Sequence, residues 1–111
     1  MNLKEASARA NEIRRLYSQL EERLYGRRWS TQEIMLGFQG DVGDLAKLIQ
    51  AAEGVRNVED LDEKLAHELA DCLWSLLVLA QCLEIDIEQA FDATMTTLEV
   101  RIRNKLKETQ W

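Results

Sequence analysis

The segments GDVGDLAKLI (residues 40–49) and HELADCLWSLLVLA (residues 67–80) each carry two acidic residues three positions apart, Asp41/Asp44 and Glu68/Asp71. A helix advances about 100° per residue, so residues three and four apart lie on one face. Each acidic pair therefore shares its face with apolar residues: Ile34, Phe38, Leu45 and Leu48 with the first pair, and Leu61, Leu65, Cys72 and Leu79 with the second. The pattern predicts two helices that direct four carboxylates towards the core.

Carboxylates in a core need a partner, because a bare buried charge is strongly destabilising. Basic residues are scarce on these two faces, and Lys64 is the clearest of them. A bound divalent cation would satisfy all four carboxylates at once. Ligands that are all oxygen favour a hard ion, Mg²⁺ or alternatively Mn²⁺, over zinc. The sequence therefore predicts a metal site formed by Asp41, Asp44, Glu68 and Asp71.

The whole chain is typical of an all-α protein. It contains no proline and five glycines, so helix breakers are few and helical periodicities run long. We expect helices over residues 2–25, 31–53, 60–83 and from 87 onward, with a loop over residues 54–59. Gly26 is placed to end the first helix, and Ser30 with Glu33 has the form of a capping box that starts the second. Four helices predict a four-helix bundle-like protomer in a single domain, residues 1–111.

The third and fourth helices have start signals of their own. Asp60, with Glu63 three residues later, has the form of an acidic capping box, and Asp86 is placed to cap the fourth helix. We expect the fourth helix to fray into its charged end, RIRNKLKETQW (residues 101–111). From Cys72 the third helix is apolar nearly all round, which favours a central position or a dimer interface.

Length, charge and cysteine content limit the possible partners. The apolar third helix of this 111-residue chain leads us to expect a homodimer or homotetramer. A net charge of −6 argues against nucleic acid as a partner, whereas single nucleotides bound through a metal remain allowed. No apolar run approaches the ~20 residues that cross a membrane, and residues 1–15 lack the apolar core of a signal peptide. Cys72 and Cys82 lie too far apart on one helix for a disulfide; we expect buried, reduced thiols and a cytoplasmic protein.

Gly37, Gly40 and Gly43 lie beside Asp41 and Asp44, inside the predicted second helix. Glycine in a helix interior costs ~1 kcal/mol relative to alanine, so three of them need a reason. Either a ligand or a neighbouring backbone approaches closely there, or the helix packs tightly against another helix. The sequence does not favour one of these explanations over the other.

The two acidic segments resemble the paired motifs of the all-α nucleoside triphosphate pyrophosphatase superfamily, specifically its MazG-like branch. The resemblance covers residues 29–95, most of the chain. Glu68 and Asp71 match the second motif of the family. The first motif usually has two glutamates, and this chain has the shorter Asp41 and Asp44 in their place.

A second departure from the family lies in the fourth helix. Many relatives carry a lysine there and, four residues later, an asparagine that assists the site. Thr94 and Leu98 stand at these positions. The chain has therefore lost two polar groups, or takes them from Arg101 or from a partner subunit.

The resemblance implies a Mg²⁺-dependent hydrolase that cleaves nucleoside triphosphates between the α and β phosphates, giving a monophosphate and pyrophosphate. The four acids would hold the metal, and non-canonical nucleotides are candidate substrates. Either Asp41 or Glu68 would take the proton of the attacking water. The residues do not decide between the two.

Three further residues are candidates for binding the substrate. Lys47 and Lys64 lie within a turn or two of the acids and would pair with phosphate oxygens, unless they form surface salt bridges. Trp29, in the first connection, is a candidate pocket wall, since an aromatic face stacks on any base. Trp74 is assigned to the core or to an interface.

Two other classes of protein also place acids inside helices. A di-iron carboxylate bundle needs Glu-x-x-His pairs, and Lys64 stands three residues before the lone His67, which argues against that class. A non-enzymatic relative that binds nucleotide or protein without hydrolysis is the alternative that stays open, and Thr94 and Leu98 favour it. Release of pyrophosphate from triphosphates separates the enzyme from this alternative.

Overall fold

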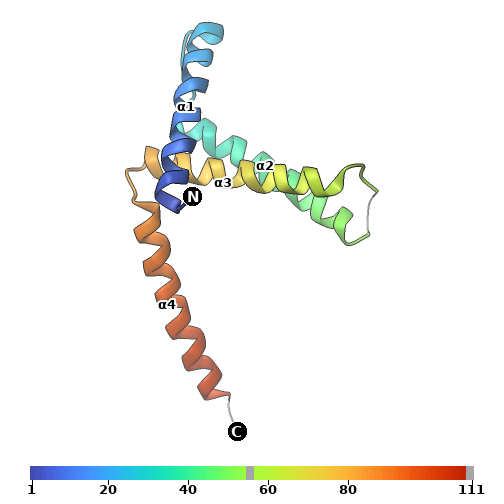
Figure 1. Ribbon diagram of the computed structural model, residues 1–111, viewed down its shortest axis with the longest axis vertical. Coiled ribbons are helices and arrows are strands. Elements are labelled where there is room, and N and C mark those ends of the chain that lie inside the picture. Colours follow the sequence, from blue (N-terminus) through green and yellow to red (C-terminus); the bar gives the residue numbers. More distant parts are fainter. Residues whose placement is uncertain (55–56, 110–111) are drawn as a thin grey trace.

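The computed structural model describes residues 1–54 and 57–109 of the chain. Over these residues it consists of four helices and no strand: α1 (Leu3–Tyr25), α2 (Thr31–Ala52), α3 (Leu61–Cys82) and α4 (Ile87–Glu108) (Figure 1). The prediction of an all-α protein is confirmed. Two residues of the predicted loop over 54–59, residues 55 and 56, lie outside the described part.

Most of the predicted helix ends are confirmed. Gly26 has φ 76°, and its N–H donates to the carbonyl of Glu22, a left-handed end that glycine adopts without strain. Ser30 Oγ accepts from the N–H of Glu33 at 3.2 Å, and Glu33 Oε1 accepts from the N–H of Ser30 at 3.1 Å, which completes the capping box. Asp86 accepts from the N–H of Gln89 at the start of α4.

Two predicted helix ends are wrong. Asp60 has φ 53° and makes no side-chain cap bond, because a cap residue reaches the first turn from an extended backbone, not from a left-handed one. The charged end of the chain does not fray at residue 101: α4 continues to Glu108. Two features favour a helix there. Arg103 pairs with Glu99 one turn earlier, and basic residues in the last turn interact favourably with the helix dipole.

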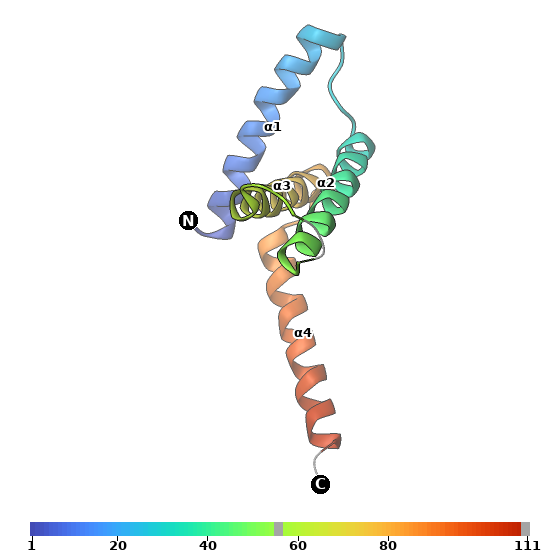
Figure 2. The same cartoon turned by 90° about the vertical axis from the view of Figure 1, so that its right-hand side faces the viewer.

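The helix α3 is the one on which α1 and α2 pack. α2 lies beside it, and α1 crosses its C-terminal half (Figures 1 and 2). The core is small and lies at this crossing, where Ala10 and Ile34 meet Leu77 and Val78. Trp74 packs against the same core and donates its indole N–H to the carbonyl of Ala10 at 3.0 Å. The central position predicted for α3, and the core position predicted for Trp74, are confirmed.

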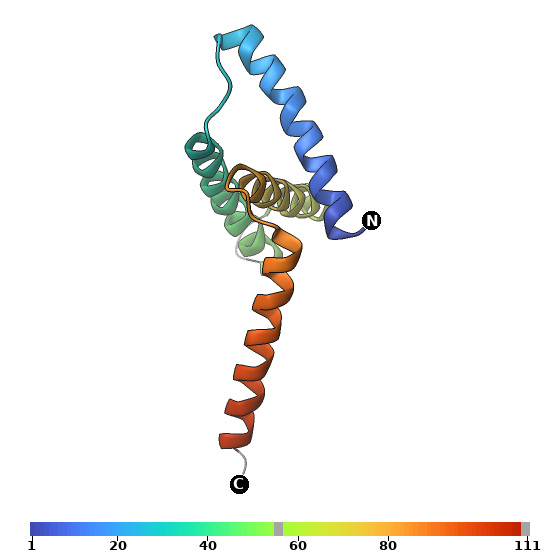
Figure 3. The same cartoon turned by 90° about the vertical axis from the view of Figure 1, so that its left-hand side faces the viewer.

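The helix α4 does not close a bundle. It extends away from the other three helices, and none of its residues is buried (Figures 1 and 3). The short connection before it sets this direction: Glu84 has φ 57°, and the N–H of Ile85 donates to the carbonyl of Ala80. The radius of gyration is 18.1 Å, whereas a compact domain of about 100 residues has about 13 Å. The bundle-like protomer predicted from the sequence is therefore not formed within one chain.

Two further expectations about α3 need correction. Cys72 is buried as predicted, but Cys82 is exposed because it lies at the end of the helix, past the core; both are free thiols. By length and composition α3 could also cross a membrane, contrary to the expectation from the sequence. One such helix is weak evidence, since core helices pass the same test, and α3 packs against α1 and α2.

Candidate functional site

Three of the predicted metal ligands meet between α2 and α3. Asp41 and Asp44 lie in the middle of α2, and Glu68 lies in the middle of α3. One carboxylate oxygen from each of the three residues lies within 4.8 Å of the others. The i, i+3 spacing places both aspartates on the side of α2 that faces α3. The structure therefore brings these three acids together as the sequence predicts.

The acids lack the partners that would neutralise them. Glu68 Oε2 is buried and has no hydrogen-bond partner among the described residues. Burial raises the pKa of the Glu68 carboxyl, and the like charges of the three aspartates raise it further. Burial, then Asp71 and Asp44, likewise raise the pKa of Asp41. Crowded carboxylates with an unsatisfied buried oxygen are the arrangement that a divalent cation satisfies, so the residues fit such an ion.

The fourth predicted ligand, Asp71, lies outside this group of three. Its Oδ2 is 3.0 Å from Nε2 of the exposed His67, one turn earlier on α3. Its charge still acts on the acids, since it contributes to the raised pKa of both Asp41 and Glu68. The role of Asp71 as a ligand stays a prediction.

A cavity of about 600 Å³ opens on one side of the acids, between α1, the first connection and α3. Asp41 and Asp71 belong to its wall, together with four aromatic residues: Tyr17, Tyr25, Trp29 and Trp74. The rings of Tyr17 and Trp74 stand edge to face, with centroids 6.0 Å apart. The structure thus places Trp29 beside the acids, in the position of a pocket wall.

A second hollow, of about 730 Å³, lies on the other side of the acids. Asp44 and Glu68 line it together with the two predicted phosphate ligands, Lys47 and Lys64. The three acids therefore separate an aromatic cavity from a hollow that carries two lysines. Arg101 lies on the distal half of α4, which extends away from α2 and α3 (Figure 1), and its role stays a prediction.

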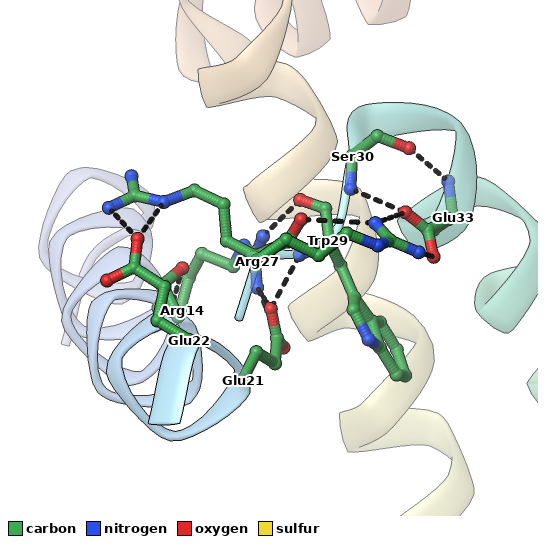
Figure 4. A network of polar contacts seen from close by, with 9 residues as sticks. Arg14, Glu21, Glu22, Arg27, Trp29, Ser30 and Glu33 are labelled. Atoms are coloured by element: carbon green, nitrogen blue, oxygen red, sulfur yellow. Dashed lines mark hydrogen bonds and ion pairs between the residues drawn. The ribbon is translucent and has the colours of Figure 1, made fainter. Parts of the chain in front are cut away.

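Arg14 and Glu21 are two residues of the aromatic cavity that the sequence reasoning missed. Both are nearly buried, and they pair with each other and with the backbone of Trp29 (Figure 4). Two exposed ion pairs, Arg27–Glu33 and Arg28–Glu22, surround them. A signal was present: Arg14 and Glu21 are seven positions apart, so they share one face of α1 beside its apolar stripe.

The three glycines of α2 face open space in the structure. Apart from adjacent residues and the backbone of α2 itself, no described atom lies within 4 Å of a Cβ atom added at Gly37, Gly40 or Gly43. Tight helix packing within the chain therefore does not explain them. Close approach of a ligand stays a prediction.

Comparison with known proteins identifies the family. No curated protein and no solved structure matches the chain. A family model, the MazG nucleotide pyrophosphohydrolase domain, matches residues 30–105, which span α2, α3 and most of α4. Members of this family are hydrolases that act on nucleoside triphosphates and generally depend on a divalent metal. Because the match covers more than half of the sequence, the chain belongs to the MazG nucleotide pyrophosphohydrolase family.

Proposed function

We propose that this protein is a Mg²⁺-dependent nucleoside triphosphate pyrophosphohydrolase that cleaves between the α and β phosphates and yields a monophosphate and pyrophosphate. One observation carries the proposal: Asp41, Asp44 and Glu68 converge between two hollows, and a buried oxygen of Glu68 has no hydrogen-bond partner within residues 1–54 and 57–109. Mn²⁺ would serve the same oxygen ligands.

The two hollows suggest how a nucleotide lies across the acids. The aromatic cavity with Trp29 offers faces on which a base stacks, and the opposite hollow offers the ammonium groups of Lys47 and Lys64 to phosphate oxygens. In this proposal a triphosphate spans both hollows with its α–β linkage beside Asp41 and Glu68. Cleavage at that linkage is assigned from the resemblance to the family, and the arrangement of the two hollows is compatible with it.

The acids have two tasks in this proposal. Asp41, Asp44, Glu68 and Asp71 would hold the ion, and the ion would supply neutralisation of phosphate charge and activation of water. Asp41 or Glu68 accepts the proton of the attacking water.

The substrate class follows from the kind of contact that the cavity offers. Aromatic walls bind any base without reading its edge, so the cavity would admit non-canonical as well as canonical bases. We propose hydrolytic removal of non-canonical nucleotides as one task of the protein. The net charge of −6 supports free nucleotides over nucleic acid. We further propose a cytoplasmic protein that does not insert into a membrane, because the apolar helix α3 carries Glu68 and Asp71 at its centre.

We also propose that the working form is a homodimer or homotetramer. Large apolar side chains on all four helices are more than a third exposed in a single chain, among them Leu16, Met35, Leu73, Phe91 and Leu98. A monomer rarely leaves so much apolar surface in water. In a symmetric homo-oligomer each copy covers the same apolar surface of its neighbour, so a second copy of this chain is the partner that we propose.

The alternative is a helical module of the same family that binds nucleotide or protein and does not hydrolyse. One observation favours it: Thr94 and Leu98 bring no charged group, and α4 extends away from the acids within one chain. In the enzyme, α4 of a partner subunit would have to reach the site. An activity assay therefore decides between the two.

The test is to incubate the protein with Mg²⁺ and a panel of canonical and damaged nucleoside triphosphates, and to measure pyrophosphate and monophosphate. We expect both products in equal amounts and none after chelation of the metal. Protein that is shown to be folded and to bind metal, yet releases no pyrophosphate from any nucleotide, would be the non-hydrolytic module.

A further inference from the structure

We propose that Arg14 and Glu21 are positioning residues that hold Trp29 in place as a wall of the nucleotide cavity. The inference rests on the proposed function for its link to nucleotide, and on the contacts of these three residues for its geometry. It gives the first connection, residues 26–30, a task beyond joining two helices.

Both peptide groups of Trp29 are held by this pair. The N–H of Trp29 donates to Glu21 Oε1 at 2.7 Å, and its carbonyl accepts from Arg14 Nη2 at 2.6 Å. Arg14 Nη1 in turn donates to both oxygens of Glu21, at 3.1 Å each. Figure 4 shows the two side chains converging on the backbone of Trp29, while its indole extends away from α1.

The exposure of these residues shows what holds the indole. The side chains of Arg14 and Glu21 are only 13% and 9% exposed, whereas Trp29 is 45% exposed. Packing therefore fixes the ion pair but leaves much of the indole free. The position of Trp29 depends on its backbone, and its backbone depends on Arg14 and Glu21.

A buried ion pair has a large desolvation cost. It is stable only if the two charges are well paired and their remaining hydrogen-bonding groups have partners. Here the planar guanidinium serves the carboxylate and a carbonyl together, which a lysine ammonium does less well. A wall that is held before the nucleotide arrives does not have to be ordered on binding, and this lowers KM.

The first experiment compares Glu21→Gln with Glu22→Gln. Glu22 is the next residue on α1 and pairs with Arg28 at the exposed surface, so the control removes a charge without touching Trp29. We expect Glu21→Gln to raise KM for the triphosphate roughly tenfold and to change kcat by less than about twofold. Arg14→Lys should also raise KM. Its control is Arg15→Lys, because Arg15 pairs with Glu12 at the exposed surface.

A double-mutant cycle separates positioning from direct contact with nucleotide. If Glu21 acts only through Trp29, then Glu21→Gln adds no further rise in KM once Trp29→Ala is present. Additive effects on KM would mean that Glu21 contacts the nucleotide itself, and would overturn the inference.

A readout without nucleotide keeps this test separate from the proposed function. The chain has three tryptophans, and protein labelled with 5-fluorotryptophan gives a fluorine resonance for each, with Trp29 assigned from Trp29→Phe. We expect Arg14→Lys and Glu21→Gln to move the Trp29 resonance and to leave that of Trp74 in place. An unmoved Trp29 resonance in variants that keep their helical content would overturn the inference. Absent pyrophosphate release in the unmodified protein would overturn only the function.

Discussion

Glu68 is the residue that most needs a partner in the candidate site. Its Oε2 is buried and has no hydrogen-bond partner in the part of the chain that the structure describes. Burial raises the pKa of its carboxyl, and the charges of three nearby aspartates raise it further. An unsatisfied buried acceptor costs about 1–3 kcal/mol. The cation proposed above would offset this cost, because it would give Glu68 Oε2 a partner.

We therefore expect two opposite effects from Glu68→Gln. In metal-free buffer the melting temperature should rise by a few degrees, because a neutral amide does not repel the aspartates. With Mg²⁺ the stabilisation seen in the unmodified protein should disappear, since a ligand has been lost. That stabilisation is about 2.7 kcal/mol when the metal is present at 100 times its Kd. Thermal unfolding followed by circular dichroism, with and without Mg²⁺, measures both effects.

The control for this experiment is Glu88→Gln, which removes an exposed charge on α4, the helix that extends away from the acids. It should keep the full metal-induced shift. If Glu68→Gln kept the same shift, Glu68 would not be a ligand.

Single residues also show how far the sequence predicts this site. The i, i+3 spacing, together with the apolar residues on the same two faces, predicted that Asp41, Asp44 and Glu68 point into one space between their helices. The spacing could not show that Asp71 pairs with His67, since that choice depends on a side-chain rotamer. Nor could it find Arg14 and Glu21 as a pair that holds Trp29, because their partners are backbone groups of a connection whose path only the folded chain defines.

At the scale of elements, the start of α2 combines a capping box with an ion pair. Glu33 accepts the N–H of Ser30 and, with both oxygens, the guanidinium of Arg27. The hydrogen bonds from Arg27 are the main cause that lowers the pKa of Glu33 from 4.5 to about 2. Because the folded-state pKa is the lower one, the stabilisation is present above pH 4.5 and is lost as the pH falls towards about 2.

Glu33→Gln isolates this contribution, since glutamine also completes a capping box but carries no charge. We expect the variant to be slightly less stable than the unmodified protein at neutral pH. The difference should shrink as the pH falls from 4.5 to about 2. Urea unfolding at a series of pH values measures it. A difference that stays constant across that range would show that the ion pair does not contribute.

The elements also show which features of helices are local. Gly26, Ser30 and Asp86 ended or began their helices as predicted, because each signal works within one turn of the chain. The course of α4 was not predictable in this way. Its stripe of Phe91, Leu98 and Ile102 requires a covering surface, but periodicity does not say whether that surface belongs to the same chain.

At the scale of the whole molecule, a single chain buries little apolar surface. Only Ile34, Leu77 and Val78 among its large aliphatic residues are buried over the described part of the chain, and of these Val78 alone is fully buried. The radius of gyration of 18.1 Å reflects an open arrangement. A folded domain of this length is stable by only about 5–15 kcal/mol even when its core is complete. The exposed apolar faces of the four helices therefore support the homodimer or homotetramer proposed above.

The stripe on α4 is the place to test assembly, because that helix has no buried residue in a single chain. Leu98 is 46% exposed at the middle of the stripe. We expect Leu98→Lys to shift the protein from dimer or tetramer towards smaller species and to lower its melting temperature. In the unmodified protein the melting temperature should rise with protein concentration, as mass action requires. Thr97→Lys adds the same charge at the neighbouring exposed position and should leave assembly intact. Sedimentation of the unmodified protein as a monomer at every concentration would contradict the role given to α4.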